Sequence, residues 1–176
     1  GLGFSPNKNK NLFYSLSLDK KIILKLFDIR DYKKLNQFIN SSKPSIIFHL
    51  AAQPLVIESY KNPFFTFDIN SRGTLNVLEV SKNSKFVKSI VLITSDKCYE
   101  NIEKDHAYLE TDSLGGYDPY SSSKACAEHV SFAYYRSFLK EQGVGLATVR
   151  AGNIIGGGDW STDRLIPDVV KAWSRK

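Results

Sequence analysis

The 176-residue sequence contains no methionine, not even at position 1, and only two cysteines. The missing initiator predicts that the chain is either processed or a fragment of a longer protein. Cys98 and Cys126 stand apart, with no CxxC pair and no His/Cys spacing typical of metal ligands, so neither a disulfide framework nor a metal site is predicted. We expect two reduced thiols in a cytoplasmic protein.

Long apolar runs and dense basic blocks are also missing. No apolar run approaches the roughly 20 residues needed to span a bilayer, and the start, "GLGFSPNKNKN", lacks the apolar core of a signal peptide. The net charge is +6, but the lysines are scattered through amphipathic segments such as "DYKKLNQFINSSK". We therefore expect neither a membrane nor a nucleic acid as partner.

Short apolar runs alternate with longer amphipathic stretches along the whole chain. The predicted strands, read as buried, cover residues 21–28, 45–52, 90–93 and 145–150; the predicted helices cover 31–41, 68–82, 119–142 and 163–173. This alternation predicts an α/β fold, a doubly wound Rossmann-like parallel sheet with helices on both faces.

Segments that contain polar residues lie at the end of each predicted strand. They are Asp28, Ala51–Gln53, Thr94–Lys97 and Arg150–Asn153. Because the carboxyl ends of parallel strands meet at one edge, where such sheets bind their ligands, these residues are expected to lie near one site. The abrupt change from "IVLI" to "TSDK" at residues 90–97 is thus interpreted as a functional strand end rather than a polar turn.

Tyr120 and Lys124 are four residues apart in "DPYSSSKACAE", on one face of a predicted helix. A tyrosine can act as a base at neutral pH only if a nearby cation lowers its pKa, and Lys124 supplies that cation. The pair alone also fits an exposed helix start. With Ser95 at a neighbouring strand end, it favours removal of a proton from an alcohol, which pairs naturally with hydride transfer to a nicotinamide.

Four segments together resemble the extended short-chain dehydrogenase/reductase superfamily, in its NAD-dependent epimerase/dehydratase family. They are "FHLAAQPLV", "ITSDKCYEN", "LGGYDPYSSSKACAE" and "VRAGNIIGGGDW". Within this superfamily, Asp96–Lys97 and "GGGDW" are most similar to the dehydratases that act on CDP-glucose; the dTDP-glucose relatives have Asp–Glu at the first of these motifs. The resemblance implies NAD as cofactor, a nucleotide sugar as substrate and a homo-oligomeric assembly.

The resemblance also implies catalytic roles for three strand-end residues, Ser95, Asp96 and Lys97, and for Tyr120 and Lys124 of the helix. Tyr120, assisted by Lys124, would take the proton of the C4 hydroxyl, to which Ser95 would hydrogen-bond. Lys97 would then remove the C5 proton, and Asp96 would protonate the departing C6 hydroxyl, giving CDP-4-keto-6-deoxyglucose. Burial would adjust the pKa values of Asp96 and Lys97 for these roles, while their mutual attraction would oppose it.

Cofactor contacts are implied at two further strand ends. Asp28 and Ile29, in "DIRD", are similar to the family's adenine-binding turn. Leu50, Ala51 and Ala52 match the strand end that passes under the ribose and phosphates of the cofactor.

Three more residues match positions around the nucleotide groups. Asn70 matches a helix asparagine that either contacts the cofactor or has a structural role. Asn153 matches a position that holds the diphosphate of the sugar nucleotide. Arg164 either neutralises the same phosphates or is simply an exposed helix arginine.

The glycines expected for phosphate binding are missing at the start of the chain. "GLGFSP" has no preceding strand, and Pro6 occupies the place of the third glycine. We therefore expect the Gly-rich βαβ unit to lie upstream of residue 1. Residues 1–151 are interpreted as a partial NAD-binding domain, and residues 152–176 as the start of a truncated sugar-nucleotide-binding region.

Two other functions remain open from the sequence. A nucleotide-sugar 4-epimerase of the same superfamily needs Tyr120 and Lys124 but no acid and base beside Ser95. A non-catalytic Rossmann-fold binding protein would keep the fold alone.

Overall fold

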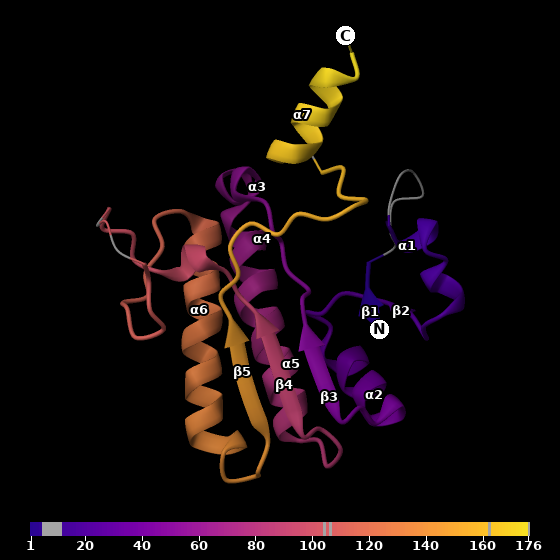
Figure 1. Ribbon diagram of the computed structural model, residues 1–176. Coiled ribbons are helices and arrows are strands. Elements are labelled where there is room, and N and C mark those ends of the chain that lie inside the picture. Colours follow the sequence, from indigo (N-terminus) through magenta and orange to yellow (C-terminus); the bar gives the residue numbers. More distant parts are fainter. Residues whose placement is uncertain (5–11, 104, 106, 162, 176) are drawn as a thin grey trace. The chain divides into compact units, whose positions relative to one another are not determined.

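The computed structural model describes residues 1–4, 12–103, 105, 107–161 and 163–175, so Pro6 lies outside the described part (Figure 1). The chain forms two compact units. The larger consists of Ile29–Gly152, and the smaller consists of Gly1–Asp28 together with Asn153–Lys176.

The larger unit is built on a parallel three-stranded sheet, with strand order β3-β4-β5. The strands are β3 (Ile46–His49), β4 (Ser89–Ile93) and β5 (Gly145–Val149). Ser89, at the start of β4, pairs with Ile46 on one side and with Gly145 on the other. Three of the four predicted strands are therefore confirmed, in the predicted parallel arrangement.

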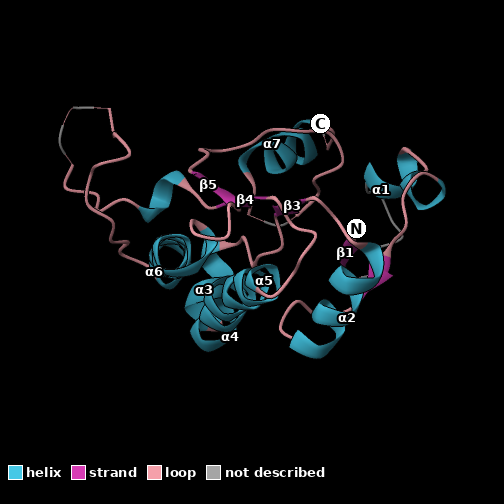
Figure 2. Cartoon of the chain, turned by 90° about the horizontal axis from the view of Figure 1, so that it is seen from below, coloured by secondary structure: helices cyan, strands magenta, loops and turns pink. Residues whose placement is uncertain are grey.

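Helices connect these strands and cover one face of the sheet. Figure 2 shows α3, α4, α5 and α6 on the same side of the sheet. The helical segments of this unit are α2 (Tyr32–Ser42), α3 (Val56–Lys61), α4 (Pro63–Phe67), a π-helical turn (Asp68–Arg72), α5 (Gly73–Lys82), a 3₁₀ turn (Asp96–Cys98), α6 (Pro119–Tyr134) and a second π-helical turn (Tyr135–Leu139). The Rossmann-like α/β fold is confirmed.

The two faces of the sheet differ in burial. His49, Ile90 and Leu92 point toward the helices and are buried, whereas Ile46 and Phe48 are 52% and 65% exposed. The interpretation of the second predicted strand as buried is therefore wrong for one of its faces. The reason is that the described helices of this unit pack on a single face of the sheet.

In its described residues, the smaller unit contains two short paired strands, two α-helices and a 3₁₀ turn (Leu18–Lys20). Leu2–Gly3 (β1) pairs in parallel with Lys25–Leu26 (β2). The helices are α1 (Leu12–Ser15) and α7 (Leu165–Trp173). The strand predicted over 21–28 is thus much shorter than expected, because its partner strand has only two residues. The predicted C-terminal helix is confirmed as α7.

The described residues contain neither a candidate membrane-spanning helix nor a candidate metal site. Among them, no helix combines the length and apolar character needed to cross a membrane. The described residues also contain no cluster of three or more His, Cys, Asp or Glu side chains suited to a metal ion.

His49 is buried at the end of β3 and bonded within the core. Its Nε2 lies 3.1 Å from Oγ1 of Thr74, and the Thr74 hydroxyl donates its own hydrogen to the backbone oxygen of Asn70. The His49 Nε2 atom must therefore carry the hydrogen of this contact. Burial, assisted by the positive charge of Lys124, lowers the pKa of His49 from about 6.5 to about 4.

This shift predicts a specific acid sensitivity. Between pH 6.5 and pH 4 the unfolded chain binds a proton at His49 that the folded chain does not, so the free energy of unfolding falls as pH falls. The loss over this window is about 3 kcal/mol at most. Urea denaturation at a series of pH values should show it, and His49→Gln should remove it. His129→Gln, at an exposed site of α6, is the control that should keep it.

Candidate active site

The segment after β4 is held by the sheet rather than forming a free turn. The backbone N–H of Thr94 donates to Val149 O at 2.9 Å, and that of Asp96 donates to Ala151 O at 3.0 Å. Ser95, between them, is buried. Its hydroxyl oxygen caps the 3₁₀ turn Asp96–Cys98 by accepting from the Lys97 N–H at 3.3 Å. The sheet pairing therefore continues into the predicted site.

Asp96 and Lys97 lie at the surface of this turn and contact each other. Lys97 Nζ is 3.8 Å from Asp96 Oδ1, and the Ser95 hydroxyl donates to the same carboxylate oxygen at 3.1 Å. The side chains of Asp96 and Lys97 are 49% and 41% exposed. Of the two opposing influences expected from the sequence, the mutual attraction is present, while burial is only partial.

The first turn of α6 is fixed by a helix cap. Asp118 Oδ1 accepts from the backbone N–H groups of Tyr120 and Ser121, at 2.9 and 3.1 Å. Pro119 occupies the first helical position, where its missing N–H leaves no hydrogen bond unmade. Tyr120 is consequently placed in the first turn of α6, and it is buried.

Lys124 lies one turn further along α6 and reaches the end of β4. Its side chain is buried, and Nζ donates to Ile93 O at 3.2 Å. Burial lowers the pKa of Lys124 from 10.5 to about 8, an effect that Cys98 partly opposes. The lysine is therefore still mainly protonated at neutral pH, as its predicted role beside Tyr120 requires. The structure thus brings the predicted Tyr–Lys helix against the strand end that carries Ser95.

Two consecutive glycines connect this strand end to α6. Gly115 N–H donates to Cys98 O at 2.9 Å, and Gly116 O accepts from the Ser122 hydroxyl at 2.6 Å. Gly116 has φ of +112°, and a Cβ atom there would lie 2.5 Å from the carbonyl carbon of Ser121. Both the backbone angle and the close approach require glycine.

Gly116→Ala is therefore expected to lower the free energy of unfolding by at least about 2 kcal/mol. It should also reduce the turnover of the nucleotide-sugar reaction expected from the sequence, because the start of α6 would shift. Gly143→Ala is the matched control, because Gly143 also has positive φ, +68°, but open space around it. That control should lose about 1 kcal/mol and keep its turnover. Chemical denaturation and steady-state rates measure both effects; equal losses of stability in the two variants would contradict the close approach at Gly116.

A buried carboxylate on α6 was not predicted from the sequence. Glu128 is fully buried, two turns after Tyr120, and accepts from the hydroxyls of Thr94 and Thr148 and from the Arg150 guanidinium. Burial alone would lower the pKa of Arg150, but its hydrogen bond to Glu128 raises it, so the ion pair is retained. The available signal was a lone carboxylate at i+4 from Lys124, on the same helix face as Tyr120 and Lys124.

Asn70 is held in place by protein groups. Its Oδ1 accepts from the Gln53 N–H at 2.8 Å, and its Nδ2 donates to Gln53 O at 3.1 Å and to Ser123 Oγ at 2.8 Å. Both amide hydrogens of Asn70 are thereby used to connect the segment after β3 to α6. The structural role is observed, and the cofactor contact stays a prediction.

The other predicted cofactor residues differ in exposure. Leu50 is exposed directly after β3, with Ala51 and Ala52 half-buried behind it. Ile29 is buried, and its backbone oxygen accepts from the Asn76 amide at 3.0 Å. Asp28 ends the first segment of the smaller unit. Cofactor contacts at these positions stay predictions.

The two predicted substrate residues belong to the smaller unit. Asn153 is exposed at the start of its second segment. Arg164 directly precedes α7, and its Nε lies 3.9 Å from Asp159 Oδ2. Their contacts with a sugar nucleotide therefore stay predictions.

Comparisons with known proteins found relatives that cover most of the chain. CDP-glucose 4,6-dehydratase of Salmonella typhimurium is 49% identical to the chain, over 93% of the chain and 47% of that protein. UDP-glucose 4-epimerase of Mycoplasma genitalium is 30% identical, over 97% of the chain and 51% of that protein. The chain spans about half the length of these relatives.

A solved structure shows the same fold. The crystal structure of a double mutant of DesIV, a dTDP-glucose 4,6-dehydratase from Streptomyces venezuelae with NAD and DAU bound, matches with a TM-score of 0.79 and 25% identity, over 91% of this chain and 48% of that one. The family model described as GDP-mannose 4,6 dehydratase matches residues 5–149. The chain therefore belongs to the GDP-mannose 4,6 dehydratase family, within the superfamily indicated by its sequence motifs.

Proposed function

We propose that the protein is an NAD-dependent nucleotide-sugar 4,6-dehydratase that converts CDP-glucose to CDP-4-keto-6-deoxyglucose. The observation that carries this proposal is the strand end at Ser95–Lys97, where a hydroxyl, a carboxylate and an amine follow one another beside the buried Tyr120 and Lys124 of α6. The 49% identity to a CDP-glucose 4,6-dehydratase supports the same reaction and the same nucleotide.

The residues at this edge of the sheet fit NAD. Lys124 donates one of its three N–H groups to Ile93 O, which leaves donors for a ribose hydroxyl. The segment after β3, with Leu50 exposed and Ala51 and Ala52 half-buried, lies at the carboxyl edge where such sheets bind nucleotides. When bound, NAD would accept the hydride from C4 of the sugar and return it to C6.

Proton removal at C4 would be performed by Tyr120. The phenol is buried, and the lysine one turn away carries the positive charge that favours the phenolate. Ser95 would hydrogen-bond the same sugar oxygen and orient it toward Tyr120. Oxidation at C4 then acidifies the neighbouring C5 proton.

Elimination of water would be performed by the next two residues. Lys97 would take the C5 proton, and Asp96 would give a proton to the C6 hydroxyl as it leaves as water. When the hydride returns to C6, Lys97 would give a proton back to C5, by then exchanged with solvent. These roles require a neutral amine and a protonated carboxyl. Both side chains are half-exposed here, so substrate binding must supply the missing burial by covering them.

A direct test is to incubate the whole protein with NAD and CDP-glucose in heavy water. The expected product has lost one molecule of water and carries deuterium at C5. An isomer of unchanged mass would identify the 4-epimerase instead, and no conversion at all would favour a non-catalytic binding protein. Parallel reactions with dTDP-, UDP- and GDP-glucose should be slower if CDP is the nucleotide.

Two further properties follow from the family by analogy. We propose a homo-oligomer located in the cytoplasm. Light scattering coupled to size-exclusion chromatography would measure the assembly, and a monomer at micromolar concentration would contradict it.

A further inference from the structure

Glu128 occupies a central position between α6 and the sheet. Its carboxylate is fully buried and accepts hydrogen bonds from Thr94 at the end of β4, from Thr148 in β5 at 3.0 Å, and from Arg150 just after β5 at 3.0 Å. A single helix side chain thus bonds to the ends of two neighbouring strands.

These bonds lie directly beside the proposed catalytic residues. Thr94 precedes Ser95, and Glu128 lies one helical turn after Lys124, whose Nζ bonds to Ile93 O. The helix is therefore attached to two successive residues of the β4 end, Ile93 through Lys124 and Thr94 through Glu128. Any shift of α6 along β4 would break both bonds.

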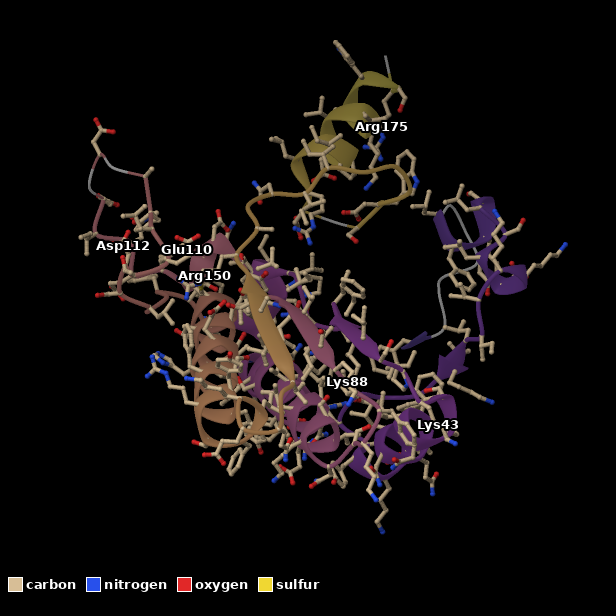
Figure 3. All side chains as sticks on the ribbon, turned by 60° about the horizontal axis from the view of Figure 1, so that its bottom comes forward. Lys43, Lys88, Glu110, Asp112, Arg150 and Arg175 are labelled. Atoms are coloured by element: carbon tan, nitrogen blue, oxygen red, sulfur yellow. The ribbon has the colours of Figure 1, made fainter. Side chains whose placement is uncertain are left out.

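Arg150 extends the same network to the loop that follows the site. Its guanidinium lies 4.8 Å from the ring centre of Tyr99, and its Nη1 donates to Glu110 O at 3.2 Å. Figure 3 shows Arg150 and Glu110 beside each other. The Arg150 side chain is only 8% exposed, so its charge interacts with these internal partners rather than with solvent.

Folding stability alone does not explain a buried ion pair, because apolar residues of similar volume often stabilise the folded state as well or better. Its directional hydrogen bonds, however, define one arrangement of the groups they join, which apolar contacts do not.

We propose that Glu128 and Arg150 are positioning residues: they set the placement of Ser95 relative to Tyr120 and Lys124 without contacting the substrate. For its activity readout, this inference rests on the proposed dehydratase function.

Three variants of the whole protein test the inference. Glu128→Gln keeps the volume and removes the charge. The double variant Glu128→Leu/Arg150→Met replaces the pair with apolar side chains and is expected to remain folded. Glu79→Gln is the matched control, because Glu79 also pairs with a cation (Lys82) and joins α5 to α6 through the Tyr134 hydroxyl, but none of its described bonds reaches a strand end.

The first measurement is steady-state turnover of CDP-glucose. A misplacement of about 1 Å can reduce the rate of a reaction by about 100-fold, so kcat should fall about 10- to 100-fold in both Glu128 variants. KM for the nucleotide sugar should change less than about threefold, because the binding contacts are intact. The Glu79 variant should keep the kcat of the unmodified protein.

The second measurement does not depend on the reaction. Amide hydrogen exchange should become at least about tenfold faster at Thr94 and Asp96 in both Glu128 variants, while Ile90 and Leu92 in the middle of β4 keep their protection. If the unmodified protein does not dehydrate CDP-glucose, the proposed function fails, and this exchange pattern alone decides the inference. Equal acceleration at all four amides, or unchanged exchange and kcat in the double variant, would overturn it.

Discussion

Replacing Tyr120 with phenylalanine is expected to reduce the turnover of CDP-glucose by about 10²- to 10⁴-fold, because the proposed proton acceptor for the C4 hydroxyl is lost. The phenyl ring would remain in the buried first turn of α6, which Asp118 and Pro119 fix independently of the tyrosine hydroxyl. Stability should therefore change little compared with the loss of rate. The block would occur before oxidation, so neither dehydrated product nor reduced nicotinamide should form.

The structure provides a closely matched control for this substitution. Tyr117 is fully exposed and lies three residues before Tyr120, outside the helix. Tyr117→Phe should retain the turnover of the unmodified protein, which would exclude a general effect of changing a tyrosine in this loop. A Tyr120→Phe variant with undiminished turnover would remove Tyr120 from the mechanism.

Replacing Lys97 with alanine is expected to cause a similar loss of turnover, about 10²- to 10⁴-fold, at a later step. In the proposed mechanism, removal of the C4 proton by Tyr120 does not require Lys97, whereas removal of the C5 proton does. Lys97→Ala should therefore still form reduced nicotinamide in a single turnover. In heavy water it should incorporate no deuterium at C5, as nuclear magnetic resonance of the recovered sugar nucleotide would show.

Lys88→Ala is the control for this second prediction. Lys88 immediately precedes β4, at the opposite end of the same strand, and is exposed (Figure 3). Its replacement removes the same charge and should leave both turnover and deuterium incorporation unchanged. Full turnover in Lys97→Ala would assign the base to another group. Loss of both signals in that variant would show that Lys97 acts before or during oxidation.

Much of the fold could be predicted from local patterns. The apolar run before Thr94 predicted β4, and Pro119 with the Tyr120–Lys124 spacing predicted α6. Both predictions were possible because the patterns typical of strands and helices involve residues close together in the sequence. The predicted helix over 119–142 is observed as α6 followed by a π-helical turn. The placement of Ser95 at the ligand edge was predicted from the rule that parallel strands share one such edge.

The parts that could not be predicted depend on contacts between distant residues. Glu128 bonds to Thr94 and Thr148, at separations of 34 and 20 residues, and neither threonine shows a pattern of its own. The exposure of Phe48 was missed for a related reason, since an apolar residue in a strand does not reveal whether a second layer covers its face. The half-exposure of Lys97 likewise depends on what packs over the 3₁₀ turn.

The contrast between neighbouring residues of the β4 end has a consequence for how this family can evolve. Thr94 and Ser95 are buried, whereas Asp96 and Lys97 project outward and form a partly exposed ion pair. Because exposed ion pairs contribute only about 0–1 kcal/mol to folding, substitutions at positions 96 and 97 should be tolerated by the scaffold. Substitutions at these two positions can therefore introduce a different acid or base beside an unchanged Tyr–Lys pair. The reaction of a family member can change in this way while its fold is kept.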